Sequence, residues 1–239
     1  MGYYGYGYGM YFDPTYVLVI IGMILCLGAS ALVNSTMRKY SRVRNMSGLT
    51  GAEAARRILN NEGLYNVQIE CLQKDSGDHY DPRTNTVRLS YGNYNSASIT
   101  AVGVAAHECG HAIQHAKGYA PLSIRSALVP VVNIGSQLGV PLILLGVLLS
   151  WNQVLIQIGI WAFALSVLFQ LVTLPVEFNA SRRAVTKVEQ YGLLTSEENK
   201  GCKKVLTAAA LTYVAAAASA ILQLLRLVLL FGNNRRRRD

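Results

Sequence analysis

The chain has 239 residues, of which 51% are hydrophobic and 15% are charged, whereas soluble domains carry about 25% charged residues. This composition excludes an ordinary soluble domain and indicates an integral membrane protein. The formal net charge of +9 does not indicate a nucleic-acid partner, because the Lys and Arg residues cluster beside apolar runs, where they set membrane topology.

Residues 1–15 form a leader rich in Tyr and Gly, and residues 16–33 are an apolar run of 18 residues. A helix of that length spans a bilayer core of roughly 30 Å. No Lys or Arg precedes the run, whereas Arg38, Lys39 and Arg42 follow it closely. By the positive-inside rule, the run is predicted to be a transmembrane helix whose N-terminus faces outward and whose other end faces the cytoplasm.

Residues 38–128 hold much of the polar sequence and are predicted to form a cytoplasmic region. Thr50 begins a T-G-A-E sequence with the spacing of a capping box, which predicts the start of a helix. Alternating apolar residues predict short strands near 67–71 and 86–89. The Gly/Asn-rich residues 91–95 are predicted to be a loop.

The most informative stretch is H-E-C-G-H at residues 107–111, inside a run from 98 to 115 that is typical of one helix. His107 and His111 stand four positions apart and share a helical face, so both imidazoles can bind one metal ion. Glu108 lies beside them, where a carboxylate can accept a proton from a water molecule that the metal activates. The pattern predicts the site of a zinc hydrolase.

Catalytic zinc commonly has three protein ligands and one open position, so a third ligand must come from elsewhere in the chain. His115 lies eight residues after His107, which places it about 12 Å away along a straight helix, too far for one ion. His79 is the other remaining histidine. Glu177, directly after a long uncharged run, is the better candidate, although such an acid can also simply end a transmembrane helix.

Three further apolar runs follow, at 129–149, 154–176 and 205–231. The first two are predicted transmembrane helices, and residues 177–204 are predicted to be a cytoplasmic segment because they hold six Lys and Arg residues. If the last run also crosses, the Arg-rich tail at 232–239 lies outside, against the positive-inside rule. The alternative is that the last run packs on the catalytic region, which gives three transmembrane helices rather than four.

Hydrolysis of a peptide bond also needs a hydrogen-bond donor for the oxygen that becomes negatively charged. The sequence does not single out this donor, and the candidates are Tyr213, His79, His115, Arg182 and Arg183. The second predicted strand, near residues 86–90, is a candidate edge for backbone pairing with an extended substrate.

Taken together, these features resemble the YugP-like family of bacterial membrane zinc metallopeptidases. The matching pieces are SGLTGAEAARRIL at 47–59, DHYDPRTNTVRLS at 78–90, AAHECGHAIQH at 105–115, EFNASRRA at 177–184 and VLTAAALTYVAA at 205–216. The resemblance covers nearly the whole chain after the leader. More distantly, the order of motifs is similar to HtpX and the CAAX prenyl proteases, which are gluzincins in which a later glutamate completes the zinc site.

The resemblance implies a mainly α integral membrane protein with a small α+β gluzincin-type catalytic domain at the membrane surface. It implies one Zn²⁺ ion held by His107, His111 and Glu177, with Glu108 as the catalytic base. HtpX-like chains usually have Asp four residues after the glutamate, where it can orient a ligand histidine, and this chain has Ser181 there. They also place two membrane spans before the motif, and this chain has one.

The predicted function is a zinc endopeptidase of the bacterial cell membrane, multi-pass, with its site on the cytoplasmic side. Its predicted partners are protein or peptide substrates and the lipid bilayer, with membrane proteins or further copies of the chain as additional candidates. Turnover of damaged membrane proteins would agree with the HtpX resemblance.

Two alternatives compete with this function. A catalytically silent membrane scaffold with a zinc site is disfavoured because a purely structural site has no use for Glu108. An intramembrane protease is disfavoured because the uncharged apolar stretch before the motif, residues 99–106, is too short to reach deep into a bilayer.

Overall fold

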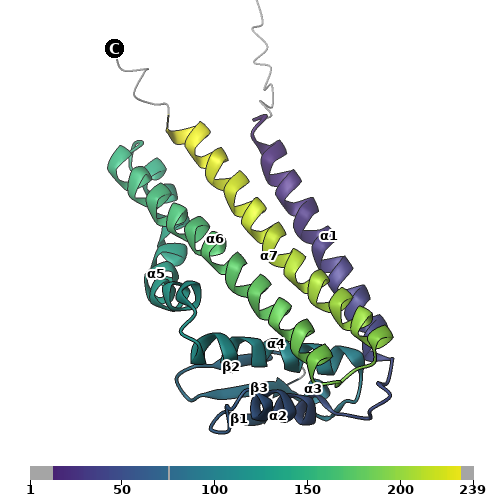
Figure 1. The fold of residues 1–239 in the computed structure, drawn as a ribbon. Coiled ribbons are helices and arrows are strands. Elements are labelled where there is room, and N and C mark those ends of the chain that lie inside the picture. The colour runs from purple at the N-terminus through teal and green to yellow at the C-terminus, as the bar shows by residue number, and fades with distance from the viewer. Residues whose placement is uncertain (1–12, 75, 233–239) are drawn as a thin grey trace, which may run out of the picture.

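The computed structural model describes residues 13–74 and 76–232 of the chain. As expected, they form a mainly helical protein with one small sheet. The elements in chain order are α1 (Tyr16–Ser41), α2 (Gly51–Asn61), β1 (Gln68–Leu72), β2 (His79–Asp81), β3 (Thr86–Ser90), α3 (Tyr91–Asn95), α4 (Ile99–Ala116), α5 (Ala120–Leu148), α6 (Gln153–Gln190) and α7 (Ser196–Phe231). Figure 1 shows that α1, α5, α6 and α7 extend away from a compact layer, here called the polar layer, that holds the sheet and α2 to α4.

Side-chain caps fix the starts of two helices in the polar layer. Thr50 Oγ1 accepts a hydrogen bond from the Glu53 amide at 3.2 Å, and Glu53 Oε2 accepts one from the Thr50 amide at 2.8 Å. This is the predicted capping box, and it starts α2. Ser98 Oγ accepts from the Ala101 amide at 3.1 Å and starts α4, the predicted motif helix. Both helix starts therefore follow from local sequence.

Residues 91–95, predicted to be a loop, instead form the short helix α3. Asn95 Nδ2 donates to Tyr91 O at 3.1 Å across this single turn, and Asn93 Nδ2 donates to Asp78 Oδ2 at 3.0 Å. Asp78 also accepts hydrogen bonds from the end of β3. A residue outside the segment therefore helps to hold the turn, which the local sequence does not reveal.

The sheet of the described residues has the strand order β1-β3-β2, with β1 parallel and β2 antiparallel to β3. Two strands match the predicted ones, whereas β2 was not predicted. β3 is the central strand, so the expectation that residues 86–90 offer a free edge is wrong. Arg88 on β3 lies 2.9 Å from Glu70 on β1 and 2.8 Å from Asp81 on β2, and these ion pairs tie both neighbours to it.

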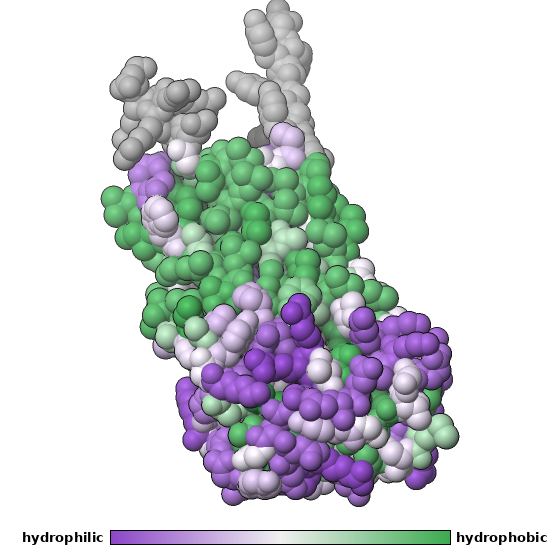
Figure 2. All heavy atoms as spheres, viewed as in Figure 1, coloured by the Kyte–Doolittle hydropathy of each residue, from purple (hydrophilic) through white to green (hydrophobic). Residues whose placement is uncertain are grey.

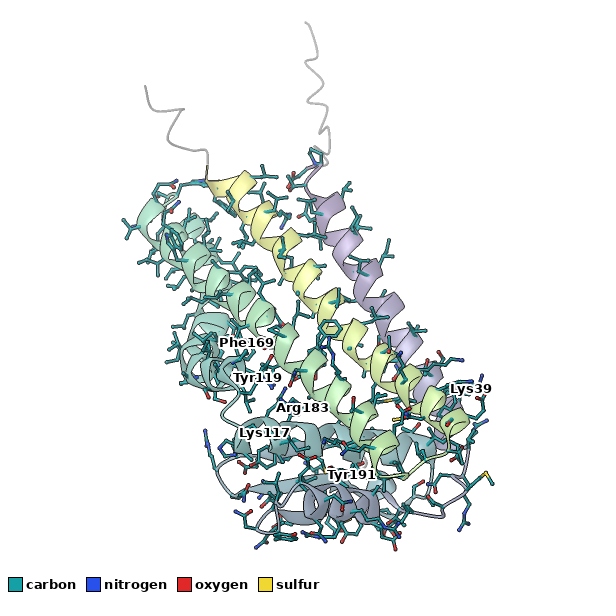
Figure 3. The ribbon with its side chains drawn as sticks, viewed as in Figure 1. Lys39, Lys117, Tyr119, Phe169, Arg183 and Tyr191 are labelled. Carbon is teal, nitrogen blue, oxygen red and sulfur yellow. The ribbon has the colours of Figure 1, made fainter. Side chains whose placement is uncertain are left out.

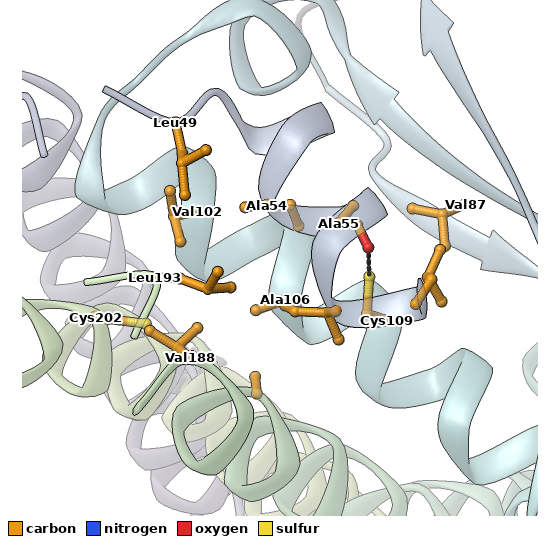
Figure 4. Packing of buried hydrophobic residues seen from close by; sticks show 14 of the residues in the cluster. Leu49, Ala54, Ala55, Val87, Val102, Ala106, Cys109, Val188, Leu193 and Cys202 are labelled. Carbon is orange, nitrogen blue, oxygen red and sulfur yellow. Dashed lines mark hydrogen bonds between the residues drawn. The ribbon is translucent and has the colours of Figure 1, made fainter. Parts of the chain in front are cut away.

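The core of the polar layer lies where α2 and α4 meet the sheet and parts of α6 and α7 (Figure 4). Small side chains fill the contact between the helices, with Ala54 and Ala55 on α2 and Ala106 and Cys109 on α4, all at most 1% exposed. Cys109 Sγ donates to Ala55 O at 3.7 Å. Close packing of this kind leaves the motif helix little freedom to shift.

The long helices extend beyond the apolar runs that predicted them. α5 begins at Ala120, well before residue 129, and α6 continues past residue 176 to Gln190. Pro175 lies inside α6 without ending it, since neighbouring groups can satisfy the backbone that a proline frees. The extension matters because it places Glu177 on a continuous helix rather than in a separate segment.

Helices α1, α5, α6 and α7 are each long and apolar enough to cross a membrane. In Figure 2 their surface is mostly hydrophobic, whereas the polar layer is mostly hydrophilic. α7 contacts α4 near its alanine-rich first half and then continues beside α1, where Arg226 Nη2 lies 3.7 Å from Asp13 Oδ2. The last apolar run thus both packs on the motif helix and forms a fourth long helix. Residues 1–12 of the leader and 233–239 of the tail lie outside the described part of the chain.

Candidate metal centre

Helices α4 and α6 cross where two histidines of one meet a carboxylate of the other. His107 Nε2 lies 3.3 Å and His111 Nε2 lies 3.7 Å from Glu177 Oε2. One potential ligand atom from each residue lies within 4.8 Å of the other two, which is close enough to hold one metal ion. The structure thus brings together the three residues that the sequence suggested as ligands.

Gly110 makes this crossing possible. A Cβ atom at this position would lie 2.6 Å from Ala180 O and 3.1 Å from Ala180 Cα on α6. Such contacts are shorter than van der Waals distance, so a side chain here would push the two helices apart. This explains why a residue that costs about 1 kcal/mol of helix propensity stands in the middle of the motif helix.

The two carboxylate oxygens of Glu177 have different surroundings. Oε1 lies 3.2 Å from Nη1 of Arg125, which projects from α5. Oε2 is buried without a hydrogen-bond partner among the described residues, although it faces the Nε2 atoms of both histidines. A buried carboxylate oxygen without a partner is costly, and a metal cation would satisfy it. Two imidazole nitrogens and one carboxylate oxygen form a ligand set of catalytic zinc sites, so these residues fit the metal.

Each imidazole is held at its other nitrogen by a neutral side chain. Ser181 Oγ lies 3.1 Å from His107 Nδ1, and Gln114 Oε1 lies 3.0 Å from His111 Nδ1. Ser181 stands one helical turn after Glu177, and Gln114 stands one turn after His111, so both partners come from the same two helices. These contacts at Nδ1 leave Nε2 of each ring to face Glu177.

The tautomer of His111 follows from a chain of hydrogen bonds that starts at Arg183. Arg183 Nε can only donate, and it donates to Asn179 Oδ1 at 2.7 Å. Gln114 Nε2 donates to the same oxygen at 3.0 Å and to Val176 O at 2.8 Å. The amide of Gln114 therefore turns its oxygen toward His111, whose Nδ1 must carry the proton. The lone pair on Nε2 of His111 is then available to a metal.

A cavity of about 580 Å³ opens beside these residues. Its wall includes Glu108, His79 on β2, Arg125 on α5 and Tyr213 on α7. Glu108 is 7% exposed and directly follows His107, so its carboxylate shares the cavity with the candidate ligands. Much of the remaining wall comes from β2, the residues on either side of it and the first half of α5, so the cavity lies between the polar layer and the long helices.

Among the described residues that line this cavity, three of the candidate oxyanion donors are missing, namely His115, Arg182 and Arg183. His115 Nδ1 lies 2.8 Å from the hydroxyl of Tyr80, which itself donates a hydrogen bond to Asn85 Oδ1 at 2.7 Å. Arg182 is exposed on α6, and Arg183 binds Asn179. His79 and Tyr213 line the cavity and remain candidates.

Two residues at the site, Gln114 and Arg125, are not singled out by the sequence reasoning. Gln114 stands three positions after His111 on the motif helix, and this spacing was a usable signal. Arg125 had no such signal, because its partner Glu177 lies on another helix and no local pattern connects the two. Figure 3 shows the polar side chains that gather where the long helices meet the polar layer, with Arg183 labelled among them.

Comparison with known proteins places the chain among its relatives. A family model described as "Putative neutral zinc metallopeptidase" matches residues 15–232. The chain is 48% identical over 197 residues to the "Putative membrane protease YugP" of Bacillus subtilis (strain 168), a match that covers 82% of this chain and 87% of that protein. No solved structure matches the chain. Because the family model spans nearly all of the described residues, the chain belongs to the neutral zinc metallopeptidase family.

Proposed function

We propose that the chain is a membrane-anchored zinc endopeptidase, in which His107, His111 and Glu177 bind one Zn²⁺ ion and Glu108 is the general base. The observation that carries this proposal is Glu177 Oε2. This buried oxygen has no hydrogen-bond partner among the described residues and faces the Nε2 atoms of both histidines. Membership of a zinc metallopeptidase family supports the choice of metal.

A zinc ion at this site would supply Lewis-acid polarisation of the peptide carbonyl and would promote the ionisation of water. Glu108 can take a proton from the attacking water and return it to the departing amine. Arg125 and Tyr213 line the same cavity and can donate hydrogen bonds to the oxygen that gains negative charge during attack. Arg125 also holds Glu177 Oε1 at 3.2 Å, which keeps Oε2 turned toward the histidines.

The strand β2 is the element best placed to hold an extended peptide. Its strand partner among the described residues is β3, which leaves the backbone groups of its other edge open to pairing. His79 and Tyr80 on β2 line the cavity together with the candidate ligands. A peptide paired with β2 would therefore lie in the same cavity as the carboxylate of Glu108.

In the proposed topology the site faces the cytoplasm of a bacterial cell. Eleven Lys and Arg residues lie in 38–128 and six in 177–204, and positive charge of this kind accumulates on the cytoplasmic side. Apolar helices form part of the cavity wall, so a substrate can be a membrane protein cut close to the bilayer. Quality control of membrane proteins is the role that we infer from this arrangement.

The test compares purified wild-type protein with Glu108→Gln, using Glu70→Gln on the exposed side of β1 as a matched control. All three proteins should bind about one zinc per chain. The wild type and Glu70→Gln should cleave casein, and Glu108→Gln should be slower by about 10²-fold or more. Equal cleavage by wild type and Glu108→Gln would remove Glu108 from the mechanism. Zinc binding without cleavage by any of the three would favour the catalytically silent scaffold.

A further inference from the structure

A second cavity, of about 680 Å³, lies between α1 and α7 at the end of these helices that meets the polar layer. It is distinct from the candidate metal centre and shares no lining residue with it. Figure 3 labels Lys39 at this end of α1, beside the start of α7. The helices approach closely here, because a Cβ atom on Gly201 of α7 would lie 2.7 Å from the ring of Tyr40 on α1. The cavity is called the groove below.

The walls of this groove change from apolar to hydroxyl to cationic along both helices. On α1 the order is Leu32, then Ser35, then Lys39, and residues at such spacing share one face of the helix. On α7, which runs in the opposite direction, the order toward the same end is Leu211, then Thr207, then the lysines. Because the helices are antiparallel, the apolar parts of the two walls lie together and the cationic parts lie together.

Four lysines line the groove, and no acidic residue appears among the described residues of its wall. Lys200 is paired with Glu197 at 2.5 Å. Lys39, Lys203 and Lys204 form no ion pair within 4.0 Å with any described residue, and all are exposed. Glu197 attracts Lys200 and Lys204 and so offsets only part of the repulsion among the four lysines. An anionic ligand would relieve the repulsion that remains.

We propose that this groove binds one anionic phospholipid of the bilayer. Lys39, Lys203 and Lys204 hold the phosphate, Ser35 and Thr207 face the glycerol and ester groups, and an acyl chain follows the apolar wall. The order of chemistry along the groove is that of a phospholipid at the membrane surface, and basic pockets between transmembrane helices bind anionic headgroups. A zwitterionic lipid brings its own cation and fits less well beside three unpaired lysines. The proposal is independent of the zinc site and of peptidase activity.

The test is native mass spectrometry of the full-length protein in detergent, titrated with phosphatidylglycerol or with phosphatidylcholine. Wild type should retain one phosphatidylglycerol per chain with a clear preference over phosphatidylcholine. Lys203→Gln combined with Lys204→Gln should weaken the binding of phosphatidylglycerol by at least about tenfold. The matched control removes the same charge from exposed positions elsewhere, by combining Arg57→Gln with Lys74→Gln, and should bind like wild type.

A third variant, Leu211→Asn, leaves the charge unchanged and should also weaken the retention of phosphatidylglycerol. Gel filtration and the thermal midpoint of each variant show that it is folded. Equal retention of both lipids by wild type, or equal losses in the lysine variant and its control, would show general surface attraction and overturn the proposal. Displacement of the lipid by millimolar inorganic phosphate, with no effect of Leu211→Asn, would make the groove a phosphate site instead.

Discussion

The imidazoles of the candidate metal centre are oriented by a hydroxyl and a carboxamide. Ser181 contacts Nδ1 of His107, and Gln114 contacts Nδ1 of His111. A carboxylate at either place would raise the basicity of the ring more strongly, but it would also add negative charge beside Glu108 and Glu177. The neutral partners fix the direction of each ring without that added charge.

The hydrogen-bond chain that ends at His111 predicts the behaviour of Gln114. Replacing Gln114 with Met, which has a similar volume and no hydrogen-bonding amide, should weaken zinc affinity by about 10–100-fold. Competition with a fluorescent chelator measures this change, and Gln73→Met at an exposed position is the control. Zinc affinity of the wild-type strength in Gln114→Met would show that the amide does not orient His111.

Ser181 gives a second prediction, because both a weaker and a stronger partner for His107 can be introduced. Ser181→Ala removes the contact at Nδ1 and should weaken zinc affinity by about tenfold. Ser181→Asp restores a stronger acceptor and should bind zinc at least as tightly as wild type. The same chelator competition measures both variants. Weaker binding by the aspartate variant than by the alanine variant would contradict the role given to this side chain.

The sequence predicts those residues of the site that stand at a recognisable spacing along one helix. His107, Glu108 and His111 follow from one helical pattern, and Glu177 was suggested by the missing third ligand. Arg125 could not be found in this way, since its contact with Glu177 depends on how α5 and α6 cross. Local patterns report neighbours along one helix but not the partners that tertiary packing brings.

At the scale of elements, capping boxes and apolar runs predict where helices begin and which helices are long and apolar enough to cross a membrane. They do not predict that α6 continues through Pro175 into a polar segment, because the apolar pattern ends while the helix does not. β2 and α3 were missed for a related reason. Each is short, and contacts from elsewhere hold each in place, namely β3 for β2 and Asp78 for α3.

The crossing of α4 and α6 predicts a specific effect of Gly110→Ala. The added Cβ would lie 2.6 Å from Ala180 O, so the helices must separate, at a cost of about 1–3 kcal/mol. Thermal unfolding in detergent should show a lower midpoint, and zinc occupancy should fall because Glu177 moves away from the histidines. Gly92→Ala, which meets nothing within 4 Å, should change neither. An unchanged midpoint and occupancy in Gly110→Ala would show that the crossing tolerates a side chain.

Glu62, the residue that ends α2, ties the polar layer to the end of α6. Its Oε1 lies 2.5 Å from both Lys187 Nζ and the hydroxyl of Tyr191, and its Oε2 lies 3.4 Å from Lys117 Nζ. Burial alone would raise the pKa of Glu62, but the hydrogen bonds from Lys187 and Tyr191 outweigh burial and lower that pKa below its usual value. The charged form therefore stabilises the fold above the unfolded pKa of 4.5, and this contribution is lost as the pH falls through the lower folded value.

Glu62→Gln should accordingly lower the thermal midpoint of unfolding at pH 7, and the difference from wild type should shrink as the pH falls below 4.5. Scanning fluorimetry in detergent across this pH range measures both effects. Glu197→Gln, in the exposed first turn of α7 with a side chain 81% exposed, controls for the loss of one acid, because a surface ion pair of this kind contributes little to stability. A difference between wild type and Glu62→Gln that stays constant down to the lowest pH would show that the ion pair is not its source.

At the scale of the whole molecule, the four long helices extend from one side of the polar layer, and the candidate metal centre lies where the two parts meet (Figures 1 and 2). The described chain starts at Asp13 and ends at Gly232, and both of these residues lie at the end of the long helices that is far from the polar layer. In the proposed topology, in which all four helices cross the membrane, both of these ends lie on the same side. The seventeen Lys and Arg residues of 38–128 and 177–204 outweigh the four of the tail, so the positive-inside rule favours a cytoplasmic polar layer.

This topology predicts which positions can be labelled in intact cells. In a chain that carries Cys71→Ser, Gln153→Cys at the start of α6 should react with a membrane-impermeant maleimide in intact cells. Arg83→Cys, after β2, should react only once the cells are broken. Gel shift with a maleimide of high mass measures both reactions. Labelling of Arg83→Cys in intact cells, with Gln153→Cys protected, would show that the protein has the opposite orientation in the membrane.

The central claim is that one zinc ion is held by two imidazoles and the carboxylate of Glu177. X-ray absorption at the zinc edge, measured on purified wild type and on Glu177→Ala, tests it directly. Wild type should hold about one zinc per chain in a shell of nitrogen and oxygen that includes two imidazoles, and Glu177→Ala should lose most of its zinc. Retention of a full zinc complement with an unchanged spectrum in Glu177→Ala would contradict the claim and make His79, which lines the same cavity, the next candidate for the third ligand.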